Sequence, residues 1–322
     1  MPGMMVEGKW KTEREWQNTD GRFVRSPTSF RGWITADGSS GFPAAAGRYH
    51  LYIAWACPWA HRTAILRKLK GLEEAIGLSV AGSFMGEDGG AFHDEPGVIP
   101  DTVNGAQFLR EVYARADPGY TGRVTTPVLW DKERGTIVNN ESREIVRMLD
   151  TEFGRIATAD ADFCSEDLRD EIDFTIDAIY EPINNGVYRS GFATTQEAYE
   201  EAVTDLFDAL DHWEGVLGTR RYLCGDRITE ADWCMFPTLV RFDAVYHGHF
   251  KCNLRRIVDY PNLWGYLRDL YGQPGVAETV NMEHIKGHYY RSHASVNPTG
   301  IVPKGPILDF EEPHDRQRLS RG

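Results

Sequence analysis

Cys57 is the residue whose position most directly suggests chemistry. It ends the apolar run YIAWAC, and Pro58 follows it at once. A cysteine here can be a packing residue, half of a disulfide, a metal ligand or a nucleophile. Residues 48–56 are aromatic and β-branched and predict a strand, whereas residues 58–71 have apolar side chains at helical spacing and end at Gly71. Because the N–H groups and dipole of a helix N-terminus favour a thiolate, we interpret Cys57 as a nucleophile.

The other cysteines do not suggest a second thiol that works with Cys57. Dithiol redox proteins have a second cysteine three positions after the first, and Ala60 stands at that position here. A mixed disulfide on Cys57 therefore needs an external thiol to release it. We interpret the remaining four, which are widely scattered, as packing residues: Cys164, Cys224, Cys234 and Cys252. The spacing of the cysteines predicts neither a disulfide framework nor a metal site, and the total of five, an odd number, fits a reducing compartment.

Two further motifs suggest a binding site for a small peptide. Thr126 precedes Pro127 at the start of a predicted strand, where a cis peptide bond would turn the backbone of Thr126 toward a cleft. Glu141 and Ser142 open the next predicted helix. A carboxylate can bind an ammonium, and a helix N-terminus with a hydroxyl can receive a carboxylate. Together with Cys57, these residues predict recognition of glutathione.

Composition limits the classes of partner. The chain has 322 residues, of which 41% are apolar, and this is enough for two domains with cores of their own. Its net charge of −13 opposes binding to nucleic acid and to anionic membrane surfaces. No window approaches the length of a membrane span, and the first residues lack the apolar core of a signal peptide. We expect a cytoplasmic protein.

The order of the predicted elements indicates a fold of two domains. Residues 46–155 read as strand, helix, strand, helix, two strands and a helix, which is the thioredoxin-like α/β arrangement. Residues 160–285 have long helical patterns and predict an all-α domain. The N-terminal arm, 1–45, should be extended and held by its aromatic rings, and the tail, 286–322, should also be extended because helical periodicity ends there. The rings of the arm are Trp10, Trp16, Phe23, Phe30 and Trp33.

One helix of the second domain has a defined start and an expected break. Thr229 and Asp232 have the spacing of a capping box, and Ile228 and Trp233 are placed to make a hydrophobic staple beside it. Pro237 should kink or interrupt the helix, because proline removes one backbone hydrogen bond and clashes with the preceding turn.

The motifs together resemble a known family. A thioredoxin-like half followed by a helical half with this capping box resembles the glutathione transferases. More narrowly, the sequence is similar to the glutathionyl-hydroquinone reductases, the Xi class, in CPWAHR, GRVTTPVLWD, TIVNNES, NNGVY, HFKCN and HYYRSH followed by NPTGIVP. The resemblance covers nearly the whole chain. It implies glutathione-dependent reduction of glutathionyl-hydroquinones, glutathione disulfide as the second product, and a homodimer.

The resemblance also implies roles for single residues. Cys57 matches the catalytic thiol. The residues that match glutathione-binding positions are Arg123, Thr126, Pro127, Glu141 and Ser142. Tyr188 and Tyr289 match the two tyrosines that line the aromatic-substrate site, so the tail, 286–322, should dock near the active site. At Gly90 the family pattern has an aromatic residue, so glutathione should lose a contact to its glycine portion, and Thr126 replaces the usual valine.

Other functions are compatible with the same residues. An Omega-like thiol transferase, which removes glutathione from thioethers or reduces dehydroascorbate and mixed disulfides, would use the same cysteine chemistry. A protein of this fold could also be a ligand carrier or a redox sensor without catalysis. Turnover of a glutathionyl-hydroquinone, turnover of only hydroxyethyl disulfide, and binding without turnover distinguish these three functions.

Overall fold

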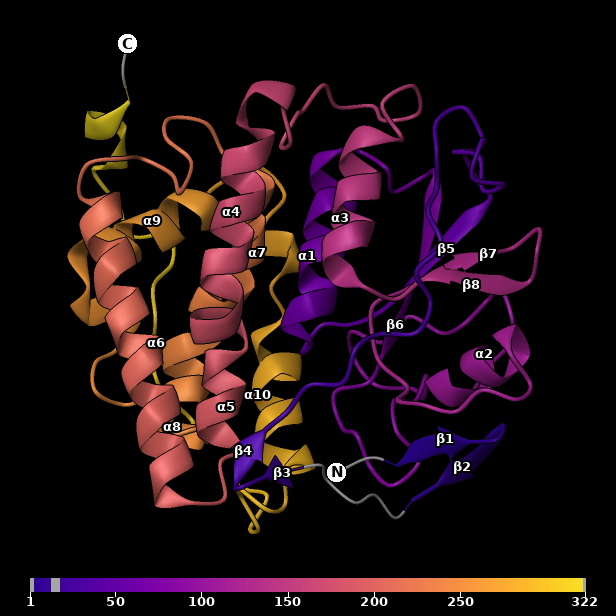
Figure 1. The fold of residues 1–322 in the computed structure, drawn as a ribbon, viewed down its shortest axis with the longest axis horizontal. Helices are drawn as coiled ribbons and strands as arrows, with labels where there is room; N and C mark the ends of the chain where they lie inside the picture. The colour runs from indigo at the N-terminus through magenta and orange to yellow at the C-terminus, as the bar shows by residue number, and fades with distance from the viewer. Residues whose placement is uncertain (1–2, 13–17, 321–322) are drawn as a thin grey trace.

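The computed structural model describes residues 3–12 and 18–320, so Trp16 lies outside the described residues. Figure 1 shows a sheet with its own helices on one side of the molecule and a bundle of longer helices on the other. The expected glutathione transferase fold, with a thioredoxin-like α/β half and an all-α half, is confirmed.

The sheet has four strands in the order β6-β5-β7-β8. These are β5 (Tyr49–Ala54), β6 (Ile76–Ala81), β7 (Val128–Asp131) and β8 (Thr136–Asn139). β5 pairs with β6 in parallel and with β7 in antiparallel fashion, so that Leu51 lies opposite both Leu78 and Leu129. Five of the six residues of β5 are buried, as expected for an apolar central strand. β5, the strand that leads to Cys57, is therefore held on both edges by neighbouring strands.

Three helices belong to the sheet: α1 (Pro58–Leu69), α2 (Leu109–Ala116) and α3 (Ser142–Thr151). α1 and α3 contact each other and lie between the sheet and the helical bundle (Figure 1). α1 begins at the predicted Pro58, and Gly71 follows its end with a φ of +60°, a backbone conformation that favours glycine. The Thr126–Pro127 peptide bond is cis, as expected.

The second half consists of helices joined by short turns. The α-helices are α4 (Arg169–Ile179), α5 (Gly186–Gly191), α6 (Gln196–Leu217), α7 (Glu230–Arg241), α8 (His247–His249), α9 (Pro261–Tyr271) and α10 (Met282–Ser292). Two π-helical turns, Tyr180–Asn184 and Phe242–Tyr246, follow α4 and α7. Short 3-10 helices occupy Glu166–Leu168, Ile257–Asp259, Ala277–Thr279 and Arg316–Leu319.

Helix α7 confirms one expectation and corrects another. Its capping box is present, with the Thr229 backbone N–H donating to Asp232 Oδ2 at 2.7 Å. Of the kink or interruption expected at Pro237, the interruption is wrong, because α7 continues through this residue to Arg241. Every residue of α7 is buried, so packing on all sides outweighs the roughly 3 kcal/mol that an interior proline costs.

The N-terminal arm contains local structure that its sequence did not predict. β1 (Met4–Val6) pairs with β2 (Lys9–Lys11), and β3 (Asn18–Thr19) pairs with β4 (Arg22–Phe23). The first hairpin is tied to the sheet half by two hydrogen bonds of about 3.0 Å between Met5 and Gly122. Phe23 packs against Tyr188 and Phe192 of the helical half. The arm therefore contacts both halves of the molecule.

The expectation of an extended tail from residue 286 is wrong at its start. α10 runs from Met282 to Ser292, and the side chain of Asn281 caps it by accepting the His284 N–H at 2.9 Å. Beyond α10 the chain has turns and one 3-10 helix but no strand as far as Ser320, and the buried Arg316 anchors it by donating to the carbonyl of Leu217 at 2.6 Å. Tyr289 is thus held on a helix.

In residues 3–12 and 18–320, no helix combines the length and apolar character that crossing a membrane requires.

Candidate active site

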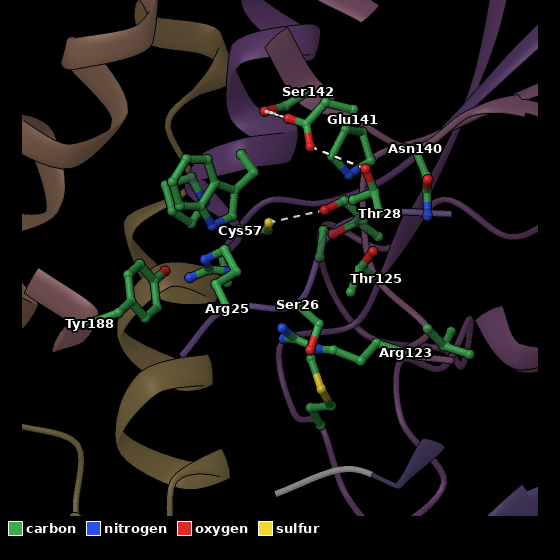
Figure 2. A pocket seen from close by; sticks show the side chains of 18 of the residues that line it. Arg25, Ser26, Thr28, Cys57, Arg123, Thr125, Asn140, Glu141, Ser142 and Tyr188 are labelled. Carbon is green, nitrogen blue, oxygen red and sulfur yellow. Dashed lines mark hydrogen bonds between the residues drawn. The ribbon is translucent and has the colours of Figure 1, made fainter. Parts of the chain in front are cut away.

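A cavity of about 450 Å³ lies where the arm, the sheet half and the helical half meet. The structure brings together in its lining all eight residues that the sequence singled out: Cys57, Arg123, Thr126, Pro127, Glu141, Ser142, Tyr188 and Tyr289. Figure 2 shows the cysteine at the centre, the Glu141–Ser142 pair on one side and Tyr188 on the other.

Cys57 is the N-cap residue of α1, with extended backbone geometry and Pro58 as the first helical residue. Its side chain does not cap the helix. Instead, the thiol donates to the backbone oxygen of Thr126 at 3.5 Å, across from the cis bond to Pro127. The sulfur thus faces the cavity from a rigid strand-to-helix junction, in contact with the backbone that would pair with a bound peptide.

Cys57 differs from the other cysteines in exposure. It is partly exposed, and the four others are buried. Burial raises the pKa of Cys164 and that of Cys252 to about 12, and it also raises the pKa of Cys224 and Cys234. Since the thiolate is the reactive form, these four thiols are inert and fit their expected role in packing.

Glu141 and Ser142 form the start of α3. Glu141 is its N-cap residue, and its carboxylate accepts hydrogen bonds from Thr28 Oγ1 at 3.2 Å and from the Arg143 N–H at 3.4 Å. The Ser142 hydroxyl lies 3.4 Å from the guanidinium of Arg62. An acceptor for an ammonium therefore stands next to N–H and hydroxyl donors for a carboxylate, as a free amino-acid end requires.

Three tyrosine hydroxyls form a chain at the helical side of the cavity. Tyr289 lies 2.5 Å from the hydroxyl of Tyr188 and 3.0 Å from that of Tyr246. Burial raises the pKa of all three, so their hydroxyls stay protonated and can donate hydrogen bonds. Tyr246 comes from the π-helical turn after α7 and was not identified from sequence, where nothing distinguishes it from a packing tyrosine.

Arg241 is a second residue that sequence reasoning missed. It is completely buried and donates to the carbonyls of Trp55 at 2.7 Å and Ala56 at 3.1 Å, the two residues before Cys57. It also contacts His61 Nδ1 at 2.9 Å, and burial together with this charge holds the pKa of His61 well below its usual value. An arginine of the helical half thus fixes the loop that carries the thiol.

Gly90 does not line the cavity. Its carbonyl accepts the Leu109 N–H at 2.8 Å, and a Cβ at this position would lie 3.6 Å from Ala81. Met85 of the same loop is the nearby residue that lines the cavity.

Groups of three or more His, Cys, Asp or Glu side chains suited to a metal ion do not occur within the described parts of the chain.

Comparison with known proteins identifies the family. The model for the N-terminal domain of glutathione S-transferases matches residues 56–152, and the model for their C-terminal domain matches residues 196–269. The chain is therefore a member of the glutathione transferase family.

Full-length relatives narrow this assignment. The chain is 51% identical to glutathionyl-hydroquinone reductase YqjG of Escherichia coli over 98% of both chains. It is 54% identical to glutathionyl-hydroquinone reductase PcpF of Sphingobium chlorophenolicum, over 94% of this chain and 96% of the other. The structure of a Xi class GST from Natrialba magadii superposes with a TM-score of 0.94 and 55% identity, covering 99% of this chain and 97% of the other. A glutathione-bound structure of YqjG gives a TM-score of 0.90 at 49% identity, with 97% and 99% covered. The chain belongs to the Xi class, the glutathionyl-hydroquinone reductases, as its motifs predicted.

Proposed function

We propose that this protein reduces glutathionyl-hydroquinones to hydroquinones, with glutathione as the reductant and glutathione disulfide as the second product. The glutathionyl-hydroquinone reductases YqjG and PcpF, whose sequences are about half identical to this one over nearly the full length, support this activity. The main structural support for this activity is that the partly exposed thiol of Cys57 and the hydroxyls of Tyr188 and Tyr289 lie in a single cavity.

In the first half-reaction, the Cys57 thiolate attacks the sulfur of the substrate and not its ring carbon. The attacked species is the keto tautomer, in which the ring carbon that bears sulfur also carries a proton. The new bond is the disulfide between Cys57 and glutathione, and the bond that breaks is the one between carbon and sulfur. Its electron pair passes through the ring to the phenolic oxygen, so the ring is reduced by two electrons while the thiol sulfur is oxidised.

The tyrosines stabilise this oxygen. The hydroxyls of Tyr188 and Tyr289 are protonated and buried, so they can donate hydrogen bonds to the developing phenolate and assist proton transfer. Because the two hydroxyls are bonded to each other, the contribution of one depends on the other.

In the second half-reaction, another glutathione resolves the mixed disulfide. Ala60 leaves no resolving thiol within the motif, so a glutathione thiolate must attack the disulfide at Cys57. This releases glutathione disulfide and restores the thiolate. The two halves share one enzyme intermediate, and ping-pong kinetics follow.

The glutathione is held by residues of the sheet half. Glu141 binds its ammonium, and Ser142 with the N-terminus of α3 receives the adjacent carboxylate. The backbone of Thr126, before the cis bond to Pro127, pairs with the cysteinyl part of the tripeptide, and Arg123 lies beside this strand.

Steady-state assays of three substrates test the proposed function. The wild-type protein should turn over glutathionyl-menadiol or another glutathionyl-hydroquinone with free glutathione. Turnover of hydroxyethyl disulfide alone would favour a thiol transferase of the Omega type, and binding without any turnover would favour a carrier or sensor. The family resemblance also supports a homodimer in the cytoplasm, which light scattering and cell fractionation can examine.

A further inference from the structure

Arg25 brings an unexpected positive charge from the N-terminal arm into the cavity. Its guanidinium lies over three aromatic rings, at 4.8 Å from the ring centre of Trp59, 5.0 Å from that of Tyr188 and 5.4 Å from that of Phe23. Asn185 accepts a hydrogen bond from Arg25 Nε at 3.0 Å and fixes its orientation. The side chain is therefore held in one place although it comes from a segment without long secondary structure.

No ion pair joins Arg25 to a carboxylate of residues 3–12 and 18–320. The neighbouring Arg22 of the same arm, by contrast, pairs with Glu201 at 2.5 Å outside the cavity. An arginine that is partly removed from water without a counter-charge is costly, unless an anion binds there during the reaction.

The position of Arg25 indicates which anion this is. Figure 2 shows its guanidinium between the sulfur of Cys57 and the ring of Tyr188. Burial raises the pKa of Tyr188, a negative charge on Cys57 raises it further, and the charge of Arg25 opposes this change, so all three groups act electrostatically on one another. In the reaction proposed above, negative charge moves from the Cys57 thiolate to the phenolic oxygen of the substrate. Arg25 lies between the thiol that loses this negative charge and the tyrosine side of the cavity, where the phenolic oxygen would be.

We propose that Arg25 binds the phenolic oxygen on which negative charge develops when the carbon–sulfur bond of a glutathionyl-hydroquinone breaks. The inference rests on the proposed function and adds to it a residue that governs substrate range. An arginine remains charged at any working pH, so it stabilises the phenolate without donating its proton, whereas the tyrosine hydroxyls supply hydrogen bonds. It thereby lets the enzyme reduce hydroquinones whose oxygen is a poor anion, and not only those acidified by electron-withdrawing substituents.

This role predicts a specific dependence on the substrate. Chlorine substituents on the ring make the phenolate more stable by themselves, so such a substrate needs Arg25 less. Reduction of hydroxyethyl disulfide forms no phenolate and needs it least. Replacing Arg25 by methionine should therefore lower kcat by about 100-fold for an unsubstituted glutathionyl-hydroquinone, by about 10-fold or less for a dichlorinated one and by less than about 3-fold for the disulfide.

The experiment compares kcat and KM for these three substrates in four proteins. These are the wild type, Arg25→Met, Arg25→Lys and the matched control Arg22→Met, which removes an arginine of the same arm outside the cavity. Arg25→Lys keeps the charge but loses the planar guanidinium, so it should recover part of the rate for the unsubstituted substrate. Thermal unfolding and calorimetric glutathione binding check that each variant is folded.

Each possible outcome decides a separate point. An equal loss on all three substrates in Arg25→Met would show that Arg25 only supports the shared thiol site, and no loss on any would show that it has no role in the reaction. Either result overturns the inference while the proposed function stands. A wild type that reduces the disulfide but neither glutathionyl-hydroquinone would instead refute the proposed function, and the assignment of Arg25 with it.

Discussion

Replacing Glu141 by glutamine removes one charge from the cavity and leaves its shape nearly unchanged. The carboxylate accepts three long hydrogen bonds, from the Thr28 hydroxyl at 3.2 Å, the Arg143 N–H at 3.4 Å and the Ser142 hydroxyl at 3.5 Å. Because these bonds are long and their donors are neutral, the negative charge of the carboxylate remains available to the ammonium of glutathione. The variant therefore measures one interaction between the protein and its proposed co-substrate.

The magnitude follows from the difference between charged and neutral hydrogen bonds. A bond to a charged group contributes about 1.5–3 kcal/mol and a neutral one about 0.5–1.5 kcal/mol. Glu141→Gln keeps an acceptor oxygen and should lose about 1–2 kcal/mol, which corresponds to a Kd for glutathione that is about 5- to 30-fold weaker. Glu141→Ala loses the acceptor as well and should weaken binding by about 10- to 100-fold.

Calorimetry measures these affinities in a Cys57→Ser background, where no mixed disulfide can form. Glu152→Gln is the matched control, since Glu152 follows the last turn of the same helix, accepts the Ala36 N–H at 2.8 Å and lies outside the cavity. Glutathione acetylated on its amino group completes a double-mutant cycle, because it has lost the positive charge from the ligand side.

The cycle tests whether the Glu141 carboxylate binds the ammonium of glutathione. Acetylated glutathione should bind equally weakly to the Glu141 protein and to Glu141→Gln. Unchanged affinity of Glu141→Gln for unmodified glutathione would show that the ammonium does not bind this carboxylate, and Glu141 would be left with its role as the N-cap of α3.

Three further changes test other parts of the structure. Arg241→Met removes the donor to the buried carbonyl of Ala56 and to the partly buried carbonyl of Trp55, so unfolding in urea should show a loss of about 3 kcal/mol or more. Arg241→Lys should lose less, and equal stability of all three proteins would contradict the anchoring role. Tyr289→Phe removes the hydroxyl between Tyr188 and Tyr246, so kcat should fall by about 100-fold for a glutathionyl-hydroquinone and remain unchanged for hydroxyethyl disulfide. A parallel fall for both substrates would assign Tyr289 to the thiol site. Burial outweighs the charge of Arg147 and raises the pKa of Glu230 from 4.5 to about 7, so the folded state binds this proton more tightly than the unfolded state does. The wild type should thus lose about 3 kcal/mol of stability as the pH rises from about 4.5 to 7, and Glu230→Gln should lack this component in urea unfolding at pH 5 and pH 8; identical pH dependence would disprove it.

Elements with strong local signals could be predicted from the sequence. Pro58 and Gly71 mark both ends of α1, because each has a backbone preference that suits one end of a helix and not its middle. The capping box at Thr229 and Asp232 marks the start of α7 in the same way. These signals depend on the residues themselves and their near neighbours, so no knowledge of tertiary contacts is needed.

α10 could not be predicted because its buried face is not apolar. The face is made by His284, Ile285, Gly287, Tyr289 and Ser292, so a search for apolar periodicity finds nothing. Tyr289 and Ser292 line the active-site cavity, where Tyr289 bonds to other tyrosine hydroxyls and Ser292 accepts the Met85 N–H at 2.9 Å. His284 Nε2 lies 2.6 Å from the carbonyl oxygen of Pro96. The uninterrupted course of α7 through Pro237 has a similar origin, since it depends on burial from all sides and not on propensity.

The residues of the active site also divide into those that the sequence marks and those that only the folded structure reveals. Cys57, Thr126 and Glu141 stand at element ends that the sequence marks, and the family motifs add Tyr188 and Tyr289. Arg25, Arg241 and Tyr246 act through contacts between segments far apart in the chain. Nothing in their immediate neighbourhood distinguishes them from solvent-exposed arginines or packing tyrosines, so only the folded structure reveals them.

Intact-mass analysis shows whether Cys57 receives the glutathione from the substrate, the step on which the proposed reaction depends. The protein is mixed with one equivalent of a glutathionyl-hydroquinone in the absence of free glutathione, quenched in acid and digested to locate the modification. We expect a single glutathione adduct on Cys57, one equivalent of released hydroquinone, removal of the adduct by added glutathione, and no adduct in Cys57→Ser. Hydroquinone release without any adduct on Cys57, or release at near wild-type rate by Cys57→Ser, would contradict this expectation.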